Sequence, residues 1–134
     1  MKLRIVNTRT NKASKPIDYV KEIQFGKSFK LVNYPVKVLW RGTTFRCPGK
    51  YPFEDIVDLM IIDTITEFSI YSITGYHAGQ MLCVLPKEAL SPNNNIRAIS
   101  KEWVIKNWDK WIYSDCVVED VYIYKPIDPQ SLKP

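Results

Sequence analysis

The sequence predicts an α+β domain in which an antiparallel sheet of about five to seven strands packs against one main amphipathic helix. The helix is indicated by residues 100–113, SKEWVIKNWDKWIY, where apolar side chains recur at i, i+4, i+7 and i+8 spacing. The sheet is indicated by the rest of the chain, whose apolar residues stand mostly in short β-branched and aromatic runs broken by Pro, Gly and Asn. Such runs need a large apolar surface to pack on, and the helix supplies one.

A capping residue and an apolar stripe define the predicted helix. Ser100 serves as the N-cap, because its hydroxyl can accept a hydrogen bond from the free amides of the first turn. Glu102 then suits the positive end of the helix dipole. At a helical period, the stripe that faces the sheet consists of Val104, Ile105, Trp108, Trp111 and Ile112. Two tryptophans are therefore expected to point into the core.

The first part of the chain predicts several short strands. Residues 2–8 and 28–33 alternate between apolar and polar side chains, as a half-buried strand does. Residues 36–46 predict a hairpin that turns at Gly42. Residues 17–25 fit either a short helix or a strand, and both interpretations stay open at this point.

The middle and the end of the chain complete the predicted sheet. Residues 53–63 mix the two periods and predict a helical turn that leads into a strand. Residues 68–74 alternate cleanly, whereas residues 80–85 are continuously apolar, which suits a strand buried on both faces. We expect these two strands to form a central hairpin around a turn at residues 75–79. Residues 117–125 are expected to form the last strand.

Length and hydropathy predict a single domain over residues 1–134, with a loose C-terminal tail from about residue 126. No run approaches the roughly 18 consecutive apolar residues that a membrane span requires. The N-terminus lacks an apolar segment after its basic residues, so no secretory signal is predicted. A cytoplasmic protein without a membrane partner is therefore expected.

The net charge of +5 is unevenly distributed along the chain. Residues 1–50 carry twelve Lys and Arg against two acidic residues, a balance of +10, whereas residues 51–134 carry seven against twelve, a balance of −5. A basic N-terminal half can attract nucleic acid or an acidic protein surface. It can equally be a solvated face without a partner.

Cysteine and histidine give little support to catalysis or metal binding. The three cysteines, Cys47, Cys83 and Cys116, form no CxxC pair, so neither a zinc site nor a disulfide is expected. His77 is the only histidine and would have to serve any Ser-His or Cys-His pair, although its GYHAG context suits a turn between two strands equally well. HExxH, GxGxxG, GxxxxGK[ST] and GxSxG motifs are absent. No enzyme activity, metal or cofactor is therefore predicted.

Acidic residues gather in two stretches of the sequence. The first contains Glu54, Asp55, Asp58, Asp63 and Glu67, and the second contains Asp115, Glu119 and Asp120. Paired carboxylates can perform acid–base or Mg²⁺ chemistry, but no fixed basic partner stands near them in the sequence. A solvated face, or a surface that binds a basic protein, explains them more simply.

Trp103 is the tryptophan that lies off the predicted stripe. It shares its side of the helix with Lys106, Asn107 and Lys110. An aromatic ring among lysines is typical of an interface anchor or of a base-stacking platform. It can also close the edge of the core, and the sequence leaves these interpretations open.

Two segments resemble a known family. GYHAGQMLCVLP at residues 75–86 is followed by ISKEWVIKNWDKWIY at residues 99–113, with tryptophans at Trp103, Trp108 and Trp111. This combination resembles the immunity protein 45 family among the bacterial immunity proteins of polymorphic toxin and contact-dependent inhibition systems. The resemblance covers residues 73–124, with residues 51–55 as a further candidate segment, and it rests on aromatic spacing instead of a catalytic signature.

The resemblance implies a small cytosolic protein that binds the C-terminal domain of a cognate toxin, without catalysis or cofactor. Many antidotes to nuclease toxins are acidic, whereas this chain is basic, so an acidic toxin on the basic half and a basic toxin on the carboxylates both stay open. The toxin-binding candidates are Glu54, Asp55, Asp58, Tyr76, His77, Trp103, Lys106, Lys110, Asp115, Glu119 and Asp120.

Two other functions compete with this hypothesis. A small basic nucleic-acid-binding module could use Trp40, Phe45 or Trp103 to stack bases, although the chain has no recognisable RNP, KH or helix-turn-helix pattern. An enzyme would have to use His77 with a carboxylate or a cysteine. The sequence does not predict the oligomeric state.

Overall fold

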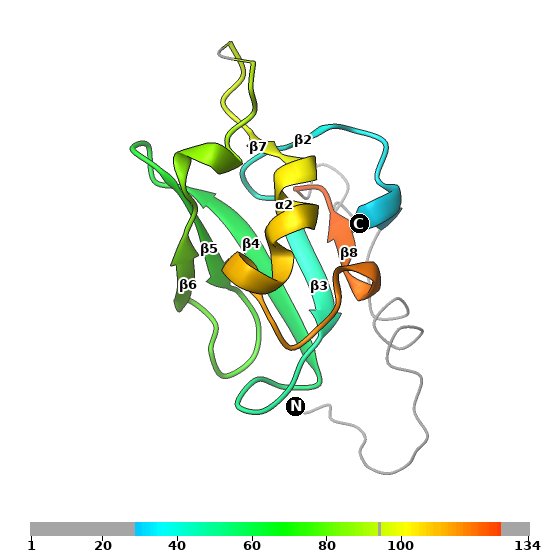
Figure 1. Ribbon diagram of the computed structural model, residues 1–134. Coiled ribbons are helices and arrows are strands. Elements are labelled where there is room, and N and C mark those ends of the chain that lie inside the picture. The colour runs from blue at the N-terminus through cyan, green and yellow to red at the C-terminus, as the bar shows by residue number, and fades with distance from the viewer. Residues whose placement is uncertain (1–28, 94, 127–134) are drawn as a thin grey trace, which may run out of the picture.

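The computed structural model describes residues 29–93 and 95–126, which form a six-stranded antiparallel sheet, a two-stranded ribbon and one main helix (Figure 1). The strands are β1 (Phe29–Lys30), β2 (Val38–Leu39), β3 (Thr44–Pro48), β4 (Ile56–Asp63), β5 (Phe68–Ser72), β6 (Met81–Val84), β7 (Ile99–Ser100) and β8 (Tyr122–Tyr124). The order in the main sheet is β1-β8-β3-β4-β5-β6, and β2 pairs with β7 in the ribbon. The predicted α+β class is confirmed.

The main helix lies across one face of the sheet (Figure 1). It begins as the α-helix α2 (Lys101–Asn107) and continues as the π-helix η3 (Trp108–Ile112). Three short 3-10 turns complete the elements: η1 (Leu31–Asn33), η2 (Lys87–Ala89) and η4 (Val118–Asp120). Ser100 caps α2, because its side chain accepts a hydrogen bond from the amide of Trp103 at 3.2 Å, as the sequence predicts.

Trp108 anchors the helix to the sheet. Its side chain is buried, and its ring meets Phe45 of β3 edge to face at 5.4 Å between centroids. In the central strand β4, side chains alternate, so that Val57, Leu59 and Ile61 join this core. The core therefore lies between one face of the sheet and the helix.

The prediction that a second tryptophan of the helix, Trp111, points into the core is wrong. Trp111 is 42% exposed, whereas Trp103 is partly buried against the core, and the two rings lie 5.9 Å apart. The reason is the change of helix type, since the amide of Tyr113 bonds the carbonyl of Trp108, five residues back. The stripe extrapolated at 3.6 residues per turn therefore fails at Trp111, whereas Ile112, its last member, is buried as predicted.

The predicted hairpin over residues 36–46 is also wrong. The turn at Gly42 exists, with a positive φ of 86° that suits glycine, but it leads from the ribbon into the main sheet. β2 pairs with β7 just before the helix, and β3 pairs with β4 and β8. β7 and β8 are distant in sequence from β2 and β3, so no local pattern could have indicated these two pairings, whereas β4 is the next strand along the chain after β3.

The remaining strand predictions hold in part. The β5–β6 hairpin exists, but β6 is an edge strand and Met81 is 52% exposed, so this strand is not buried on both faces. Residues 53–63 contain β4. The segment before the strand is an irregular turn, not the helical turn that the sequence predicts. The predicted strands over residues 28–33 and 117–125 are shorter, because η1 and η4 occupy part of each range. Residues 2–8, 17–25 and 127–134 lie outside the described residues.

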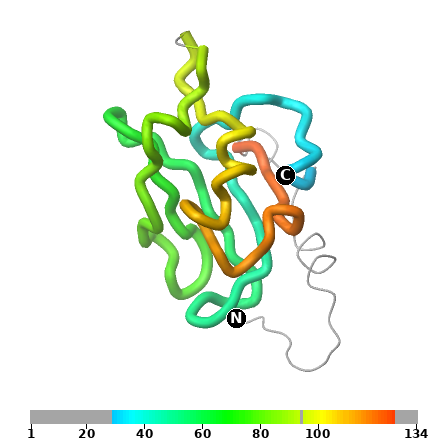
Figure 2. Tube along the Cα trace, in the orientation of Figure 1, coloured from blue at the N-terminus to red at the C-terminus, as the bar shows by residue number. Residues whose placement is uncertain are grey.

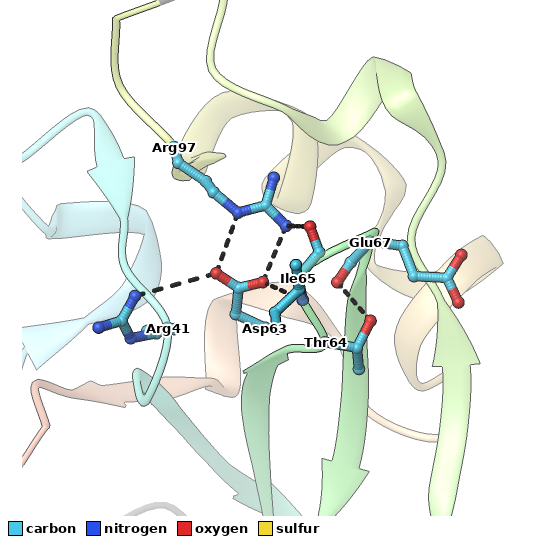
Figure 3. A network of polar contacts seen from close by, with 6 residues as sticks. All are labelled: Arg41, Asp63, Thr64, Ile65, Glu67 and Arg97. Carbon is cyan, nitrogen blue, oxygen red and sulfur yellow. Dashed lines mark hydrogen bonds and ion pairs between the residues drawn. The ribbon is translucent and has the colours of Figure 1, made fainter.

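An ionic network closes the end of the sheet at which β4 turns into β5 (Figure 3). Arg97 donates two hydrogen bonds to the carboxylate of Asp63, at 3.0 and 2.8 Å, and a third to the carbonyl of Ile65 at 2.8 Å. Arg41 lies 3.9 Å from the same carboxylate. The Arg97 bonds, followed by the Ile65 amide, lower the pKa of Asp63 to about 2.

This network makes the stability of the fold depend on acid pH. The folded-state pKa of Asp63 lies below the unfolded value of about 3.9, so its contribution is complete above that value and is lost as the pH falls from about 4 to about 2. We expect the urea midpoint of the wild type to fall more steeply across this range than that of Asp63→Asn, whose midpoint is already lower at neutral pH.

The matched control is Glu67→Gln, because Glu67 is an exposed carboxylate in the same turn. This variant is expected to follow the wild-type curve. Parallel wild-type and Asp63→Asn curves below pH 4 would contradict the assignment.

Candidate functional site

Three loops meet at the end of the sheet opposite the Asp63 network. They are residues 49–55 between β3 and β4, residues 73–80 between β5 and β6, and residues 113–117 after the helix (Figures 1 and 2). We call this region the loop junction. Side-chain contacts join the three loops, so the junction brings together segments that are far apart in the sequence.

Glu54 packs directly against the glycine at the start of the β5–β6 turn, Gly75. The carboxylate of Glu54 accepts a hydrogen bond from the amide of Tyr76 at 2.9 Å. Gly75 has a φ of +74°, and a Cβ added there would lie 2.2 Å from Oε1 of Glu54. Glycine therefore supplies both the backbone conformation and the space that this contact needs. Glu54, predicted as a toxin-binding residue, has at least a structural role.

A row of aromatic side chains fills the space behind this contact. The ring of Phe53 lies 4.7 Å from that of His77 and 5.5 Å from that of Tyr113. The hydroxyl of Tyr113 accepts a hydrogen bond from the backbone amide of Lys50 at 2.9 Å. Phe53 thus packs one loop between the other two and ties the junction to the end of the helix.

His77 is held by two oxygen atoms. Its Nδ1 lies 2.8 Å from Oε1 of Gln80, and its Nε2 lies 3.2 Å from the carbonyl oxygen of Pro52. These contacts connect the turn over residues 75–79 to the neighbouring loop. The position of His77 fits the predicted turn residue, because neither ring nitrogen faces a nucleophile.

Two tyrosines project from the loop junction into solvent. Tyr51 is 94% exposed and Tyr76 is 86% exposed. Each precedes a residue of the contact between Pro52 and His77, so both side chains start from the same braced region. Large aromatic rings on a braced surface lose little conformational freedom on binding. We call these residues the tyrosine pair.

The loop junction also gathers part of both acidic stretches. Glu54 and Asp55 come from the first and Asp115 from the second, and Asp55 and Asp115 are exposed. Burial is the main reason that the pKa of Tyr113 is raised, and the charge of nearby Asp115 adds to it. With Lys50, the three carboxylates give this end a net charge of −2.

The other acidic candidates lie elsewhere. Asp58 is buried and paired with Arg46 through two hydrogen bonds of 2.7 Å, so its carboxylate does not belong to the exposed rim. Glu119 and Asp120 lie in η4, which contacts η1 at the β8 side of the fold. The structure therefore divides the predicted acidic residues among separate places.

The helix candidates form a separate surface. Lys106 and Lys110 are exposed, and Lys106 lies 3.5 Å from Glu102. Trp103 is partly buried against the core, which favours the interpretation that it closes the core edge over the interpretation that it anchors an interface. Phe45, a predicted base-stacking residue, is fully buried under Trp108, so that prediction is wrong. The alternating pattern of its own strand could not distinguish the two faces.

The described residues offer no evident reactive or metal-binding group. All three cysteines are free, and a side-chain hydrogen bond with Cys116, together with burial, raises the pKa of Cys47. Burial raises the pKa of Cys83 to about 11. Within residues 29–93 and 95–126, no three His, Cys, Asp or Glu side chains could hold a metal ion. In the same part of the chain, no helix is long and apolar enough to cross a membrane.

The sequence missed Tyr51 and Phe53 as components of the site. Both stand in the YPF segment after a Pro-Gly turn, where aromatic residues have no strand to pack in. This context and the family resemblance over residues 51–55 were the available signals, because the partners of both residues belong to other loops.

A comparison with protein families supplies the decisive observation. The family model described as Immunity protein 45 matches residues 31–123, which is more than half of the chain. The chain belongs to the immunity protein 45 family. Neither a curated protein nor a solved structure gives a significant match. The matched range includes all three loops of the junction.

The bracing of the junction can be tested at one amide. Removing the carboxylate in Glu54→Ala should free the amide of Tyr76, because the lost hydrogen bond contributes about 1 kcal/mol. We expect hydrogen exchange at this amide to become roughly fivefold faster, as measured by NMR.

Asp55→Ala is the matched control, since it removes an exposed carboxylate from the next position. This change should leave the exchange at Tyr76 near the wild-type rate. Equal rates in Glu54→Ala and the wild type would show that the contact does not brace the turn.

Proposed function

We propose that this chain is an immunity protein that neutralises a cognate bacterial toxin domain by direct protein–protein contact. Membership of the immunity protein 45 family carries the proposal. The proposed setting is the bacterial cytoplasm, as part of a contact-dependent growth inhibition or related polymorphic toxin system. The partner is then the C-terminal domain of the toxin.

The chemistry of the described residues supports binding better than catalysis. The two ring nitrogens of His77 contact a backbone carbonyl and an amide oxygen, and the raised pKa values of Cys47 and Cys83 disfavour their thiolates at neutral pH. Neutralisation by contact needs no reactive group. It needs a stable surface that covers the toxin's active site or its access path.

The loop junction is a candidate for such a surface. Stable protein complexes commonly bury about 1,600 Å² in total, which is about 800 Å² on each partner. The loop junction offers two nearly fully exposed tyrosines on a braced backbone. The enzyme hypothesis has no comparable support in the described residues, so we place the function in binding.

Co-expression tests the proposed function directly. The C-terminal domain encoded by the adjacent upstream reading frame is expressed with and without this chain. We expect growth arrest by that domain alone, restored growth with this chain, and co-purification of the two proteins. The control carries a stop codon at position 51 of this chain, so that RNA is made without a complete protein. Continued arrest in the presence of this chain, or rescue without a complex, would contradict neutralisation by contact.

A further inference from the structure

We propose that the loop junction is the toxin-docking surface, with Tyr51 and Tyr76 as its anchors, and that it meets a positively charged face of the toxin domain. This inference rests on the proposed function and adds to it the surface and the charge of the partner. Three observations carry it: the exposure of the tyrosine pair, the bracing of its loops, and the charge around it.

The exposure of the tyrosine pair is unusual for residues of this size. Tyr51 and Tyr76 are exposed to 94% and 86%, and the Tyr76 ring touches only the edge of the junction, at His77. Most other aromatic side chains in the described residues pack against the core or against each other. Tyrosine, with tryptophan and arginine, is enriched among residues that dominate binding energy. Two such rings on one surface supply the apolar contact area that an interface centre requires.

The bracing of the loops prepares this surface for binding. Glu54 holds the amide of Tyr76, His77 contacts the carbonyl of Pro52, and Phe53 packs between His77 and Tyr113. Loops held in this way pay little ordering entropy when a partner docks. The conformational entropy of these loops is thus lost when the protein folds, and not when the partner binds.

The charge around the tyrosine pair indicates the partner. Asp55 and Asp115 are exposed, and the junction as a whole carries −2 on a chain of net charge +5. A local charge opposite to that of the whole molecule favours a basic partner at this end and disfavours nucleic acid there. The negative charge of the loop junction therefore favours a basic toxin domain over an acidic one, the two alternatives that the sequence left open.

The strongest rival surface lies at the opposite end. Trp40 is 48% exposed and Ile65 is 85% exposed, beside Arg41. The charges of the four charged residues in Figure 3 sum to zero, because Arg41 and Arg97 contact Asp63, and Glu67 lies in the same turn region. This end offers aromatic and aliphatic area without an excess charge, and it serves as the internal control.

Binding kinetics against the adjacent-frame toxin domain test the inference. We expect Tyr51→Ala and Tyr76→Ala each to raise the dissociation rate roughly tenfold or more, while Trp40→Ala leaves it unchanged. All three side chains are exposed, so the variants should keep the wild-type urea midpoint.

The charge of the partner is tested by the double variant Asp55→Asn with Asp115→Asn. It should slow association about three- to tenfold at low ionic strength, and the difference should shrink at about 0.5 M salt, where the Debye length is only a few ångströms. Faster association in this variant would show that the docked face is acidic.

The outcomes separate the two proposals. If the wild type does not bind the toxin domain, the proposed function fails and this inference fails with it. If the wild type binds and the tyrosine variants bind equally well, the docking surface is overturned while the immunity function stands. A loss of binding in Trp40→Ala alone would move the interface to the opposite end.

Discussion

The burial of Trp108 against Phe45 is the contact on which the rest of the structure depends. It places the helix across the sheet, and truncation of a buried tryptophan to alanine generally costs about 3–5 kcal/mol. The amide of Tyr113 bonds back to Trp108, and the hydroxyl of Tyr113 holds Lys50. From there Phe53 leads to His77 through ring contacts. The position of the helix thus determines the position of the loops in the loop junction.

This dependence separates the residues that brace the loop junction from the proposed docking residues within one small region. Glu54 and His77 use their polar groups to hold neighbouring backbone, so their chemistry is directed inward. Tyr51 and Tyr76 direct their rings to solvent, next to the braced positions. The same loops can therefore be held in place and still expose aromatic surface to solvent. Such a division of labour suits a protein that acts by contact, because the surface exists before the partner arrives.

The sequence predicted those features that depend on local chemistry. Ser100 caps the helix, Trp108 faces the core, and the β5–β6 hairpin turns at the expected glycines, because each depends on neighbouring residues. The pairing of β2 with β7 joins residues about sixty positions apart, and the periodicity of side chains within a segment cannot predict such a pairing. Trp111 was misplaced because the helix changes its winding at Trp108.

The candidate site was predicted only in fragments for the same reason. Tyr76, Glu54 and Asp115 stand in three different loops, and their proximity follows from the antiparallel order of the sheet and the path of the helix. Asp58 looked equivalent to Glu54 in the sequence, yet it lies in β4, on the face of the sheet away from Val57, Leu59 and Ile61, and is buried beside Arg46. The family resemblance, by contrast, was available from the sequence, and the match over residues 31–123 confirms it.

The most direct test of the account is a hydrogen-exchange footprint of the complex with the adjacent-frame toxin domain. Amide exchange is compared between the free protein and the complex along the whole chain. We expect slower exchange at residues 49–55 and 73–80, with little change at residues 64–67 of the Asp63 turn. Protection confined to residues 64–67, or to the edge strand β6, would contradict it.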